Sequence, residues 1–509
     1  MDLHHMLRRA ALVNASGVAT IEGDTRRTWA EEADRVARLA SGFEGLGVGE
    51  GDRVAILSGN HVGYWETLFA LFQLGAVAVP LNTRLTEAEL AFQLEDAGAK
   101  VLVCDGDLAA TAARLRSATL ETILGIGGAP CDFALDELIA KSAPRAGYSA
   151  TADHLAGIYY TGGTTGLPKG VMLSHGNFLA MASNLVMGLK VDRHSVILHS
   201  APMFHLADFA IFVTTMVAGT HVVIPRFDDE TMLRAISDAG VTHSFTVPLM
   251  IDRMARHSRL AEFDLSSLKA LGYGGAPMPR GTFEHARATF PDIDFLQGFG
   301  MTEMPAHTLL DADAHRDPPD SPRLRSAGQA LYLYELEVRD RDGNRLPPGE
   351  FGEIVGRGDN VMQGYWNRPE ETAKVLRDGW MHTGDAGYMD EQGNVYITDR
   401  FKDMIVTGGE NVYSIEVENV VSRFPGVLEC AVIGVPDAKW GERVHAVLVM
   451  ADGAPFDEAA FEAHCRADLA SYKRPRSAEV IAGPLPRSGA GKVLKRELRE
   501  ARMAPAEQA

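Results

Sequence analysis

The chain contains a glycine- and hydroxyl-rich run, YYTGGTTGLPKG, which begins at Tyr159 and ends at Gly170. Threonine hydroxyls, backbone N–H groups and the Lys169 ammonium can surround a phosphate with hydrogen-bond donors. A Walker A loop would need a glycine immediately before the lysine and a serine or threonine after it. Here Pro168 precedes Lys169 and Gly170 follows it. The run therefore predicts a phosphate-holding loop that is not a P-loop, with an ordinary glycine-rich turn as the alternative.

Further motifs contain residue types that suit a nucleotide. In FLQGFGMTEMPAH, Gly298 and Gly300 let the backbone approach a flat ligand closely. Thr302 and Glu303 follow, and a hydroxyl beside a carboxylate suits Mg²⁺, which takes only one or two protein carboxylates plus substrate phosphates. Asp385 in HTGDAGY could bind a ribose diol, although aspartate in such a segment is more often a turn former.

Composition excludes several classes of protein. The chain has 49 Lys and Arg against 68 Asp and Glu, a net charge of −19, which argues against broad, sequence-independent nucleic-acid binding. Four cysteines lie far apart without a CxxC, so neither a zinc cluster nor a disulfide framework is indicated. The most apolar stretch falls short of the ~20 residues of a membrane helix. We therefore expect a cytoplasmic protein without an integral membrane segment.

Hydrophobic patterning predicts an α/β fold. Short β-branched runs alternate with helical patterns, as in DRVAILSGN before an apolar helix from Tyr64, which indicates parallel sheets with crossover helices. From about Leu336, alternating strands flank Asp-Gly and Gln-Gly-Asn turns and predict a β-rich subdomain. A helix-then-strand pattern then returns, so a domain boundary is expected between Asp399 and Asp403.

Eight motifs occur in a fixed order: YYTGGTTGLPKG, APMFH, GYGGAPM, QGFGMTE, GEIVGRG, HTGD, DRFKDMIVTGGENVYSIEVE and PRSGAGK. Together they resemble the adenylate-forming superfamily of acyl-CoA synthetases, luciferases and peptide-synthetase adenylation domains, over essentially the full chain. The resemblance implies a large N-terminal domain, 1–399, of two α/β sheet subdomains plus a β-rich, barrel-like subdomain. A hinge at 400–403 and a small, mobile α+β C-terminal domain, 404–509, would follow.

The resemblance also implies a role for each motif residue. ATP or AMP would contact Thr161, Gly162, Gly163, Thr164, Thr165, Gly166, Lys169, Gly274, Gly275, Ala276, Pro277, Gln297, Gly298, Phe299, Gly300, Asp385 and Arg400. The catalytic residues would be Lys492, Thr302, Glu303 and His205. The acyl pocket would be lined by His205, Ala207, Asp208, Ile211, Tyr273, Gly275, Met304 and Pro305. CoA would contact Arg226, Gly408 and Gly409, and the hinge residue would be Lys402.

Among these residues, Glu303 would hold magnesium and Lys492 would bridge the carboxylate and α-phosphate oxygens. Two positions depart from the family pattern, which usually has Ser or Thr at Gly162 and Tyr at Phe299. The missing hydroxyl at Gly162 removes a hydrogen bond worth about 0.5–1.5 kcal/mol, whereas Phe299 keeps its stacking face. Asp208 would meet either a polar substituent of the acid or a structural partner such as a backbone N–H, and the second is favoured because buried polar groups usually find structural partners.

The activity implied by the resemblance is ATP-dependent ligation of a hydrophobic monocarboxylic acid, fatty or phenylpropenoic, to CoA, with Mg²⁺. The acid would attack the α-phosphate of ATP to give acyl-AMP and pyrophosphate, and the CoA thiol would then displace AMP. One alternative is an adenylation enzyme that loads a carrier protein. The other is a non-catalytic protein that binds acyl-AMP or nucleotide, against which the intact Glu303 and Lys492 weigh. A homodimer is a common default for such an enzyme.

Overall fold

The computed structural model describes residues 1–147, 150–161, 167–276, 278–400, 405–408, 410–437, 439–451, 453–487 and 493–503. The chain divides into two compact units. Unit 1 comprises Met1–Thr161, Pro168–Leu336 and Gly356–Met381, and unit 2 comprises Gly162–Leu167, Glu337–Val355 and His382–Ala509. The hinge predicted at 400–403 stays a prediction, since 401–404 lie outside the described residues.

Sheet A of unit 1 has nine strands in the order β16-β15-β14-β13-β12-β10-β11-β1-β2. The pairs from β14 across to β1 are parallel, and β2, β15 and β16 add antiparallel edges. The strands are β1 (Val18–Glu22), β2 (Thr25–Thr28), β10 (Val196–His199), β11 (Thr220–Val223), β12 (His243–Thr246), β13 (Ala270–Gly274), β14 (Asp294–Met301), β15 (Met304–Leu310) and β16 (Gln329–Ala330).

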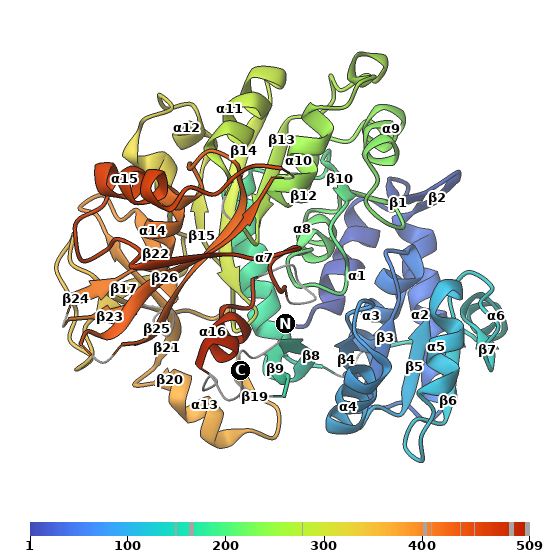
Figure 1. Ribbon diagram of the computed structural model, residues 1–509. Coiled ribbons are helices and arrows are strands. Elements are labelled where there is room, and N and C mark those ends of the chain that lie inside the picture. Colours follow the sequence, from blue (N-terminus) through green and yellow to red (C-terminus); the bar gives the residue numbers. More distant parts are fainter. Residues whose placement is uncertain are drawn as a thin grey trace. The chain divides into compact units, whose positions relative to one another are not determined.

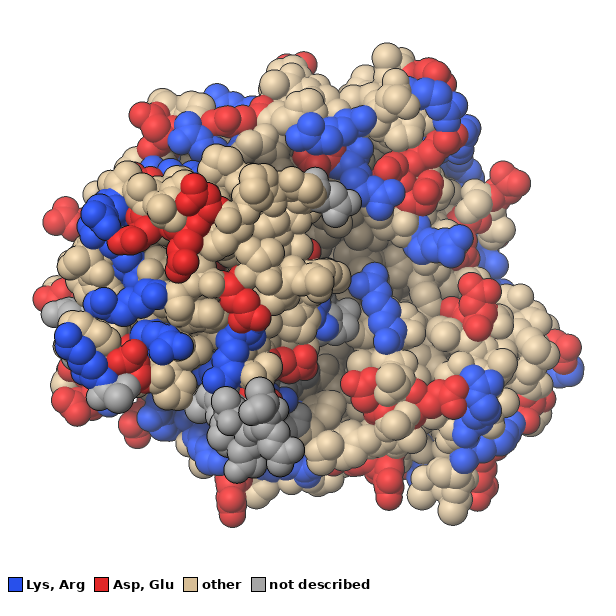
Figure 2. Space-filling view, viewed as in Figure 1, with Lys and Arg blue, Asp and Glu red and all other residues tan. Residues whose placement is uncertain are grey.

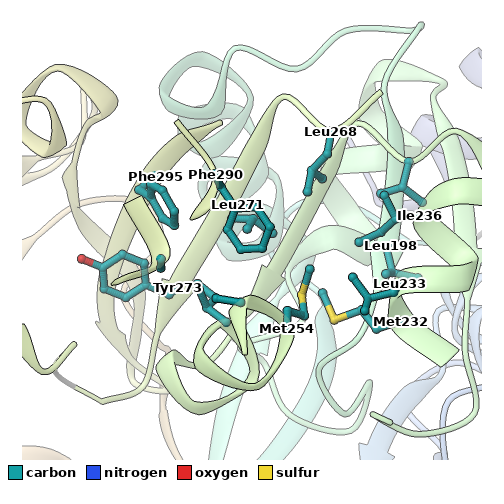
Figure 3. Close-up of a cluster of buried hydrophobic side chains, with 14 of the residues drawn as sticks. Leu198, Met232, Leu233, Ile236, Met254, Leu268, Leu271, Tyr273, Phe290 and Phe295 are labelled. Atoms are coloured by element: carbon teal, nitrogen blue, oxygen red, sulfur yellow. The ribbon is translucent and has the colours of Figure 1, made fainter. Parts of the chain in front are cut away.

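Helices pack on both faces of sheet A (Figure 1). They are α7 (His175–Leu189), α8 (Ala210–Val217), α9 (Asp229–Ala239), α10 (Pro248–Ala255), α11 (Arg280–Thr289) and α12 (Ala312–His315). On one face, Figure 3 shows Leu233 and Ile236 of α9 near Leu198 of β10, in a buried cluster that also includes Leu271 of β13 and Met254 of α10. The apolar residues of α9 and α10 thus cover the inward residues of the strands on this face.

Sheet B of unit 1 has eight strands in the order β19-β9-β8-β4-β3-β5-β6-β7. They are β3 (Arg53–Leu57), β4 (Val77–Pro80), β5 (Val101–Cys104), β6 (Thr122–Gly125), β7 (Phe133–Ala134), β8 (Leu155–Thr161), β9 (Lys169–Ser174) and β19 (Gly364–Tyr365). β8 and β9 form an antiparallel hairpin, and β19 continues the sheet from β9. The helices of this region are α1 (His4–Val13), α2 (Trp29–Gly45), α3 (Val62–Leu74), α4 (Glu87–Ala97), α5 (Ala109–Arg114), α6 (Leu135–Lys141) and α13 (Pro369–Val375).

Helix α3 is buried on every side, as expected for an almost continuously apolar helix. Its aromatic side chains reach the helices of sheet A, because Phe72 lies 6.3 Å from Phe212 of α8 and Phe178 of α7 stacks on Phe212 at 4.5 Å between ring centroids. Gly75 ends the helix in the left-handed conformation. One aromatic layer therefore holds α3, α7 and α8 together.

The strands of unit 2 lie in two sheets. The first sheet, whose strand β20 lies in unit 1, comprises β17 (Glu335–Arg339), β18 (Gly352–Arg357), β20 (Leu376–Arg377), β21 (Trp380–Met389) and β22 (Val395–Arg400). The second comprises β23 (Ile405–Thr407), β24 (Glu410–Val412), β25 (Val427–Asp437), β26 (Gly441–Met450) and β27 (Ser477–Val480), with α14 (Ser414–Val421), α15 (Glu458–Asp468) and α16 (Lys495–Met503).

The α/β class predicted from the sequence is confirmed. The strand expected in DRVAILSGN is β3, and the apolar helix expected from Tyr64 begins at Val62. The β-rich texture from Leu336 corresponds to the sheet formed by β17, β18, β20, β21 and β22. Lys and Arg are interspersed with Asp and Glu on the face shown in Figure 2. Among the described helices, none combines the length and hydropathy of a transmembrane span.

A buried carboxylate of α2 joins three elements of unit 1. Glu32 has no exposed surface, and its Oε1 accepts a hydrogen bond from the Thr20 hydroxyl of β1 at 2.5 Å. Burial, reinforced by the neighbouring Glu66 of α3, raises the pKa of Glu32 to about 8. Glu66 itself is paired with Arg35, whose Nη2 lies 3.2 Å from Glu66 Oε2. Burial therefore favours the protonated form of Glu32, against the opposing charge of Arg27, whose Nη1 lies 3.7 Å from Glu32 Oε1.

We expect Glu32→Gln to raise the free energy of unfolding at pH 9 by about 2 kcal/mol. Because the folded-state pKa is raised, the folded protein binds the extra proton, and wild-type stability falls as pH rises from about 4.5 to about 8. The gain should therefore be small at pH 5 in urea denaturation. Glu137→Gln is the surface control, since Lys141 holds the pKa of Glu137 below its usual range. An equal change in the free energy of unfolding at pH 5 and pH 9 would show that Glu32 is not protonated in the folded protein.

Candidate functional site

Several residues that were predicted to contact adenine or to line the acyl pocket lie where parallel strands of sheet A end. The register of β13 and β14 pairs Tyr273 with Gln297 and Gly274 with Gly298. β10 ends at His199, and the polypeptide continues through α8 to β11, which is the neighbour of β10 on one side. β12 is the neighbour of β10 on the other side, and the next strand, β13, follows beyond it. The direction of connection therefore reverses at β10. Open α/β sheets bind ligands at the carboxyl ends of strands where the direction of connection reverses. This edge of sheet A is therefore the candidate site.

The predicted adenine-slot glycines fall into two groups. A Cβ on Gly274 would lie 2.6 Å from the Gly298 carbonyl oxygen, and one on Gly300 would lie 2.4 Å from the Ala306 backbone nitrogen, so the chain's own packing requires both glycines. Among the described residues, a Cβ on Gly298 or on Gly275 would meet no atom within 4 Å. Gly275 also has a φ of 74°, which favours glycine. Only the second pair borders open space that a planar ligand can enter.

The Tyr273 hydroxyl is held inside the sheet. It lies 2.8 Å from His315 Nε2 and 3.3 Å from Gln297 Oε1. His315 Nδ1 is 2.7 Å from the Asp311 carbonyl oxygen, so Nδ1 carries the proton and Nε2 is an acceptor. The one hydroxyl proton of Tyr273 therefore faces two acceptors, His315 Nε2 and Gln297 Oε1. Burial lowers the pKa of His315 to about 4, which keeps the ring neutral. Tyr273 and Gln297, predicted for different subsites, thus share one hydrogen-bonded group.

Phe299 packs its ring edge-to-face against buried His307, with centroids 4.7 Å apart. His307 Nδ1 lies 2.9 Å from the Met304 carbonyl oxygen, and burial lowers the pKa of His307 to about 4. Met304 and Pro305 are buried, and the Pro305 carbonyl accepts from Asn360 Nδ2 at 2.8 Å. These two residues, predicted for the acyl pocket, are packed within unit 1.

Thr302 and Glu303 form the turn between β14 and β15. Glu303 is only 7% exposed, and its Oε1 accepts a hydrogen bond from the Tyr365 hydroxyl at 2.8 Å. Lys169, the first residue of β9, places Nζ 4.9 Å from the centroid of the same Tyr365 ring. Tyr365 therefore lies between the lysine predicted for phosphate and the carboxylate predicted for magnesium. Sequence reasoning missed this residue.

A second missed residue is Glu371 of α13. Its Oε2 lies 3.0 Å from Lys169 Nζ, and its Oε1 lies 2.5 Å from Lys374 Nζ. Lys374 and Lys169 together hold the pKa of Glu371 at about 2. Both Tyr365 and Glu371 lie in the segment GYWNRPEET. The aromatic residue next to Gly364 and the acids after Pro369 are the sequence features that could have marked this segment as part of the site. Lys169 is thus ion-paired with Glu371.

The loop after β10 carries His205, whose ring lies 4.7 Å from that of Phe204. Asn60, buried and also missed from the sequence, fixes the start of this loop. Its Nδ2 donates to the Ala201 carbonyl at 2.9 Å, and its Oδ1 accepts from the Met203 N–H at 2.8 Å. The other apolar residues predicted here are the exposed Ala207 and the buried Ile211.

Asp208 begins a buried chain of polar side chains. Its Oδ2 lies 2.7 Å from His199 Nδ1, and His199 Nε2 lies 2.9 Å from His221 Nδ1. His221 Nε2 is 3.1 Å from the Thr215 hydroxyl oxygen, which also accepts from Trp65 Nε1 at 3.2 Å. Burial, with His199 beside it, lowers the pKa of His221. The structural partner of Asp208 is thus a histidine side chain. This series of hydrogen-bonded side chains connects the loop that carries His205 to β10, β11, α8 and α3.

In unit 2, Asp385 of β21 is 5% exposed and pairs in register with Arg400 of β22, so the two residues predicted for ribose lie opposite each other. Gly408 has a φ of 60°, and a Cβ there would lie 2.9 Å from the Trp440 ring. Arg226 is exposed after β11. The predicted residues that lie outside the described part of the chain are Gly162, Gly163, Thr164, Thr165, Gly166, Pro277, Lys402, Gly409 and Lys492.

Residues 7–366 match the model of the AMP-binding enzyme family, and residues 416–492 match that of the AMP-binding enzyme C-terminal domain. The chain is 42% identical to a feruloyl-CoA synthase of Amycolatopsis sp, over 96% of this chain and 97% of that protein. It is 36% identical to a long-chain-fatty-acid–CoA ligase of Mycobacterium tuberculosis, over 97% of both. ATP-bound MatB from Rhodopseudomonas palustris has a similar structure, with a TM-score of 0.87, 33% identity and complete coverage of both chains.

We expect Asp208→Asn to lower the free energy of unfolding by about 3 kcal/mol, because a neutral amide replaces the buried carboxylate that faces His199 Nδ1. His199→Gln should have a similar effect. A double-mutant cycle measured by urea denaturation should give a coupling energy of about 2 kcal/mol between the two residues.

Thr242→Val is the matched control, because Thr242 lies at the end of β10 opposite to His199. Its hydroxyl is hydrogen-bonded to the Val196 backbone. Its effect should add to that of Asp208→Asn without coupling, because the two sites share no partner. Additivity between Asp208→Asn and His199→Gln would contradict the proposed pair.

Proposed function

The chain belongs to the AMP-binding enzyme family, as its motifs predicted, and on that premise we propose that it ligates a hydrophobic monocarboxylic acid to CoA. The acid carboxylate would attack the α-phosphorus of ATP, releasing pyrophosphate and forming acyl-AMP. The CoA thiol would then attack the acyl carbon and release AMP. The protein's part is to position the reactants and to balance charge as it develops.

One observation carries this proposal. Tyr365 holds Glu303 by its hydroxyl and Lys169 by its ring face. A cation and a carboxylate are thus kept on either side of one aromatic residue, an arrangement that suits a phosphate chain with a metal ion. Lys169 would exchange its contact with Glu371 for the phosphates that leave as pyrophosphate.

The donor set at this turn fits magnesium. Glu303 supplies one carboxylate and Thr302 one hydroxyl, both hard oxygen ligands. Among the described residues, no group of three or more His, Cys, Asp or Glu side chains is arranged to hold a metal. That agrees with an ion held by one carboxylate and by substrate phosphates. Bound Mg²⁺ would neutralise phosphate charge at this position.

The remaining roles come from the family pattern. Asp385 and Arg400, opposite each other on β21 and β22, would bind the ribose hydroxyls. Lys492 would follow the negative charge between the carboxylate and the α-phosphate, and a swing about Lys402 would replace it with Gly408 and Gly409 for thioester formation. Arg226 would contact the nucleotide phosphate of CoA.

A phenylpropenoic acid is the first substrate to test, because the feruloyl-CoA synthase is 42% identical to this chain and the fatty-acid ligase 36%. The experiment is ATP–pyrophosphate exchange, followed by AMP release with and without CoA, over ferulic, 4-coumaric, benzoic and fatty acids. We expect exchange with ferulic or 4-coumaric acid and CoA-dependent thioester. Exchange without thioester would favour carrier-protein loading, and no exchange with any acid would favour a nucleotide-binding protein.

Tyr365→Phe tests the arrangement around Glu303. It removes the hydrogen bond to the carboxylate and leaves the ring face for Lys169. We expect pyrophosphate exchange to fall about tenfold, with a higher Mg²⁺ concentration needed for half-maximal rate, because Glu303 loses its fixed orientation. The measurement is the initial exchange rate across a Mg²⁺ titration.

Tyr160→Phe is the matched control, since the Tyr160 hydroxyl donates to the Asp96 carboxylate at 2.7 Å. It removes the same kind of hydrogen bond from a carboxylate to which the proposal gives no role. The Mg²⁺ dependence of this variant should match the wild type. An equal shift in both variants, or none in Tyr365→Phe, would count against the role given to Glu303.

A further inference from the structure

Two of the four cysteines, Cys104 and Cys131, meet at one end of sheet B. Their Sγ atoms lie 3.5 Å apart, although 27 residues separate them along the chain. Cys104 is the last residue of β5, and Cys131 lies in the segment between β6 and β7. The spacing of the cysteines in the sequence does not indicate this pair, because the contact depends on the path of the chain after β6.

Hydrogen bonds hold the segment between β6 and β7 beside the end of β5. The Ile126 N–H donates to the Cys104 carbonyl oxygen at 2.8 Å. The Asp132 N–H donates to the Ile123 carbonyl oxygen at 3.1 Å, and Asp132 Oδ2 accepts from the Ile123 N–H at 2.9 Å. Cys131 is the residue before Asp132, so its thiol is placed opposite that of Cys104 by bonds that involve neither sulfur atom.

The two thiols differ in their access to solvent. Cys104 has no exposed surface, whereas Cys131 is partly exposed and lies between the exposed residues Pro130 and Asp132. Burial, followed by the neighbouring Cys131 and Asp105, raises the pKa of the Cys104 thiol. A small oxidant in solution can therefore reach Cys131, whereas Cys104 is shielded and remains a thiol.

We propose that Cys104 and Cys131 form a reversible disulfide when the protein meets hydrogen peroxide. The Cys131 thiolate attacks one peroxide oxygen, the O–O bond breaks, and the departing hydroxide takes up the proton of the thiol to become water, which leaves Cys131 as a sulfenic acid. The Cys104 sulfur then attacks the Cys131 sulfur, the S–O bond breaks, and a second water leaves with the Cys104 proton. The two thiols lose two electrons, and one peroxide is reduced to two waters.

The movement that this bond requires is small. An S–S bond is about 2.05 Å long, so the two sulfur atoms must approach by about 1.5 Å from their separation of 3.5 Å. The segment around Cys131 is exposed at Pro130 and Asp132 and can supply this movement. Cys104 can stay in place, because its strand β5 is paired on both sides, with β3 and with β6.

The cysteine pair adjoins residues that support the loop carrying His205. Asp105, directly after Cys104, accepts a hydrogen bond from the Gly59 N–H through its Oδ2 at 2.6 Å. Gly59 precedes Asn60, whose side chain fixes the start of that loop. The disulfide therefore forms one residue away from a hydrogen bond that leads toward the candidate site.

Oxidation of the full chain with hydrogen peroxide, followed by unfolding, alkylation with N-ethylmaleimide and peptide mass spectrometry, tests the proposal. The peroxide concentration is one that fully oxidises a free cysteine peptide in the same tube. We expect a linked pair of peptides that contain Cys104 and Cys131, and recovery of both thiols with dithiothreitol. Alkylation of both cysteines in the peroxide-treated protein, or a link that joins other cysteines, would overturn the proposal.

Cys430 and Cys465 are the internal controls in unit 2. Burial raises the pKa of Cys430 to about 12 and that of Cys465 to about 11, so both thiols are protonated and react slowly with peroxide. We expect both to be alkylated in full after the treatment that links Cys104 to Cys131. Loss of all four thiols at the same rate would show that the pair has no special reactivity.

Two variants test the order of the two steps. In Cys104→Ala, the sulfenic acid at Cys131 has no partner, so we expect it to accumulate and to be captured by dimedone. In Cys131→Ser, we expect the Cys104 thiol to be lost at least about tenfold more slowly than in the wild type, because the peroxide cannot reach it. Cys465→Ala is the matched control for a buried cysteine and should leave the linked peptide unchanged.

Equal loss of the Cys104 thiol in Cys131→Ser and in the wild type would contradict the assigned order, as would the absence of a dimedone product in Cys104→Ala. If Cys104→Ala fails to fold, the linked peptide of the wild type and the rate in Cys131→Ser still decide.

Discussion

The arrangement of this site depends on how Tyr365 separates a cation from a carboxylate. Lys169 and Glu303 belong to different sheets, and a direct ion pair between them would leave neither charge for a ligand. The ring face of Tyr365 takes the ammonium at 4.9 Å, and the hydroxyl takes the carboxylate at 2.8 Å. Glu371 neutralises Lys169 from another direction. Lys169 and Glu303 are thus each stabilised by a partner other than the other one.

The position of Tyr365 follows from sheet B. Tyr365 is the second residue of β19, which pairs antiparallel with β9 and sets Tyr365 opposite Val171. Lys169 opens the same strand β9, so the two residues approach through one ladder. The Glu303 backbone is held as well, since its carbonyl accepts from the Met362 N–H at 2.9 Å. The segment before β19 therefore joins the turn of sheet A to the hairpin of sheet B.

The sequence pointed to individual charged residues but not to the contacts between them. Lys169 and Glu303 stand in motifs whose residue types and order suit a nucleotide, so they could be named from the sequence alone. Tyr365, Glu371 and Asn60 could not, because each acts by touching a segment that is distant along the chain. The glycines show the same limit. A side chain at Gly274 would collide with the Gly298 carbonyl oxygen, whereas one at Gly298 would project into open space, and this difference is visible only in the folded backbone.

The α/β class was predictable for a related reason. A strand buried on both faces must read as nearly continuous apolar sequence. β10 does so apart from His199, and β11 does so apart from Thr220 and His221. Successive side chains point to opposite faces, so Leu198 joins the cluster beneath α9, while His199 meets Asp208 and His221 on the other face.

Because both faces of β10 are buried, a polar side chain on either one needs a partner that is also buried. The first partner of His199 comes from the following loop and the second from the neighbouring strand. Neither spacing is periodic, so no pattern in the sequence pairs them. The requirement for a partner was predictable, and its identity was set by the way the loop after β10 returns over the sheet. The same hydrogen bonds that satisfy the histidines thereby fix the loop that carries His205.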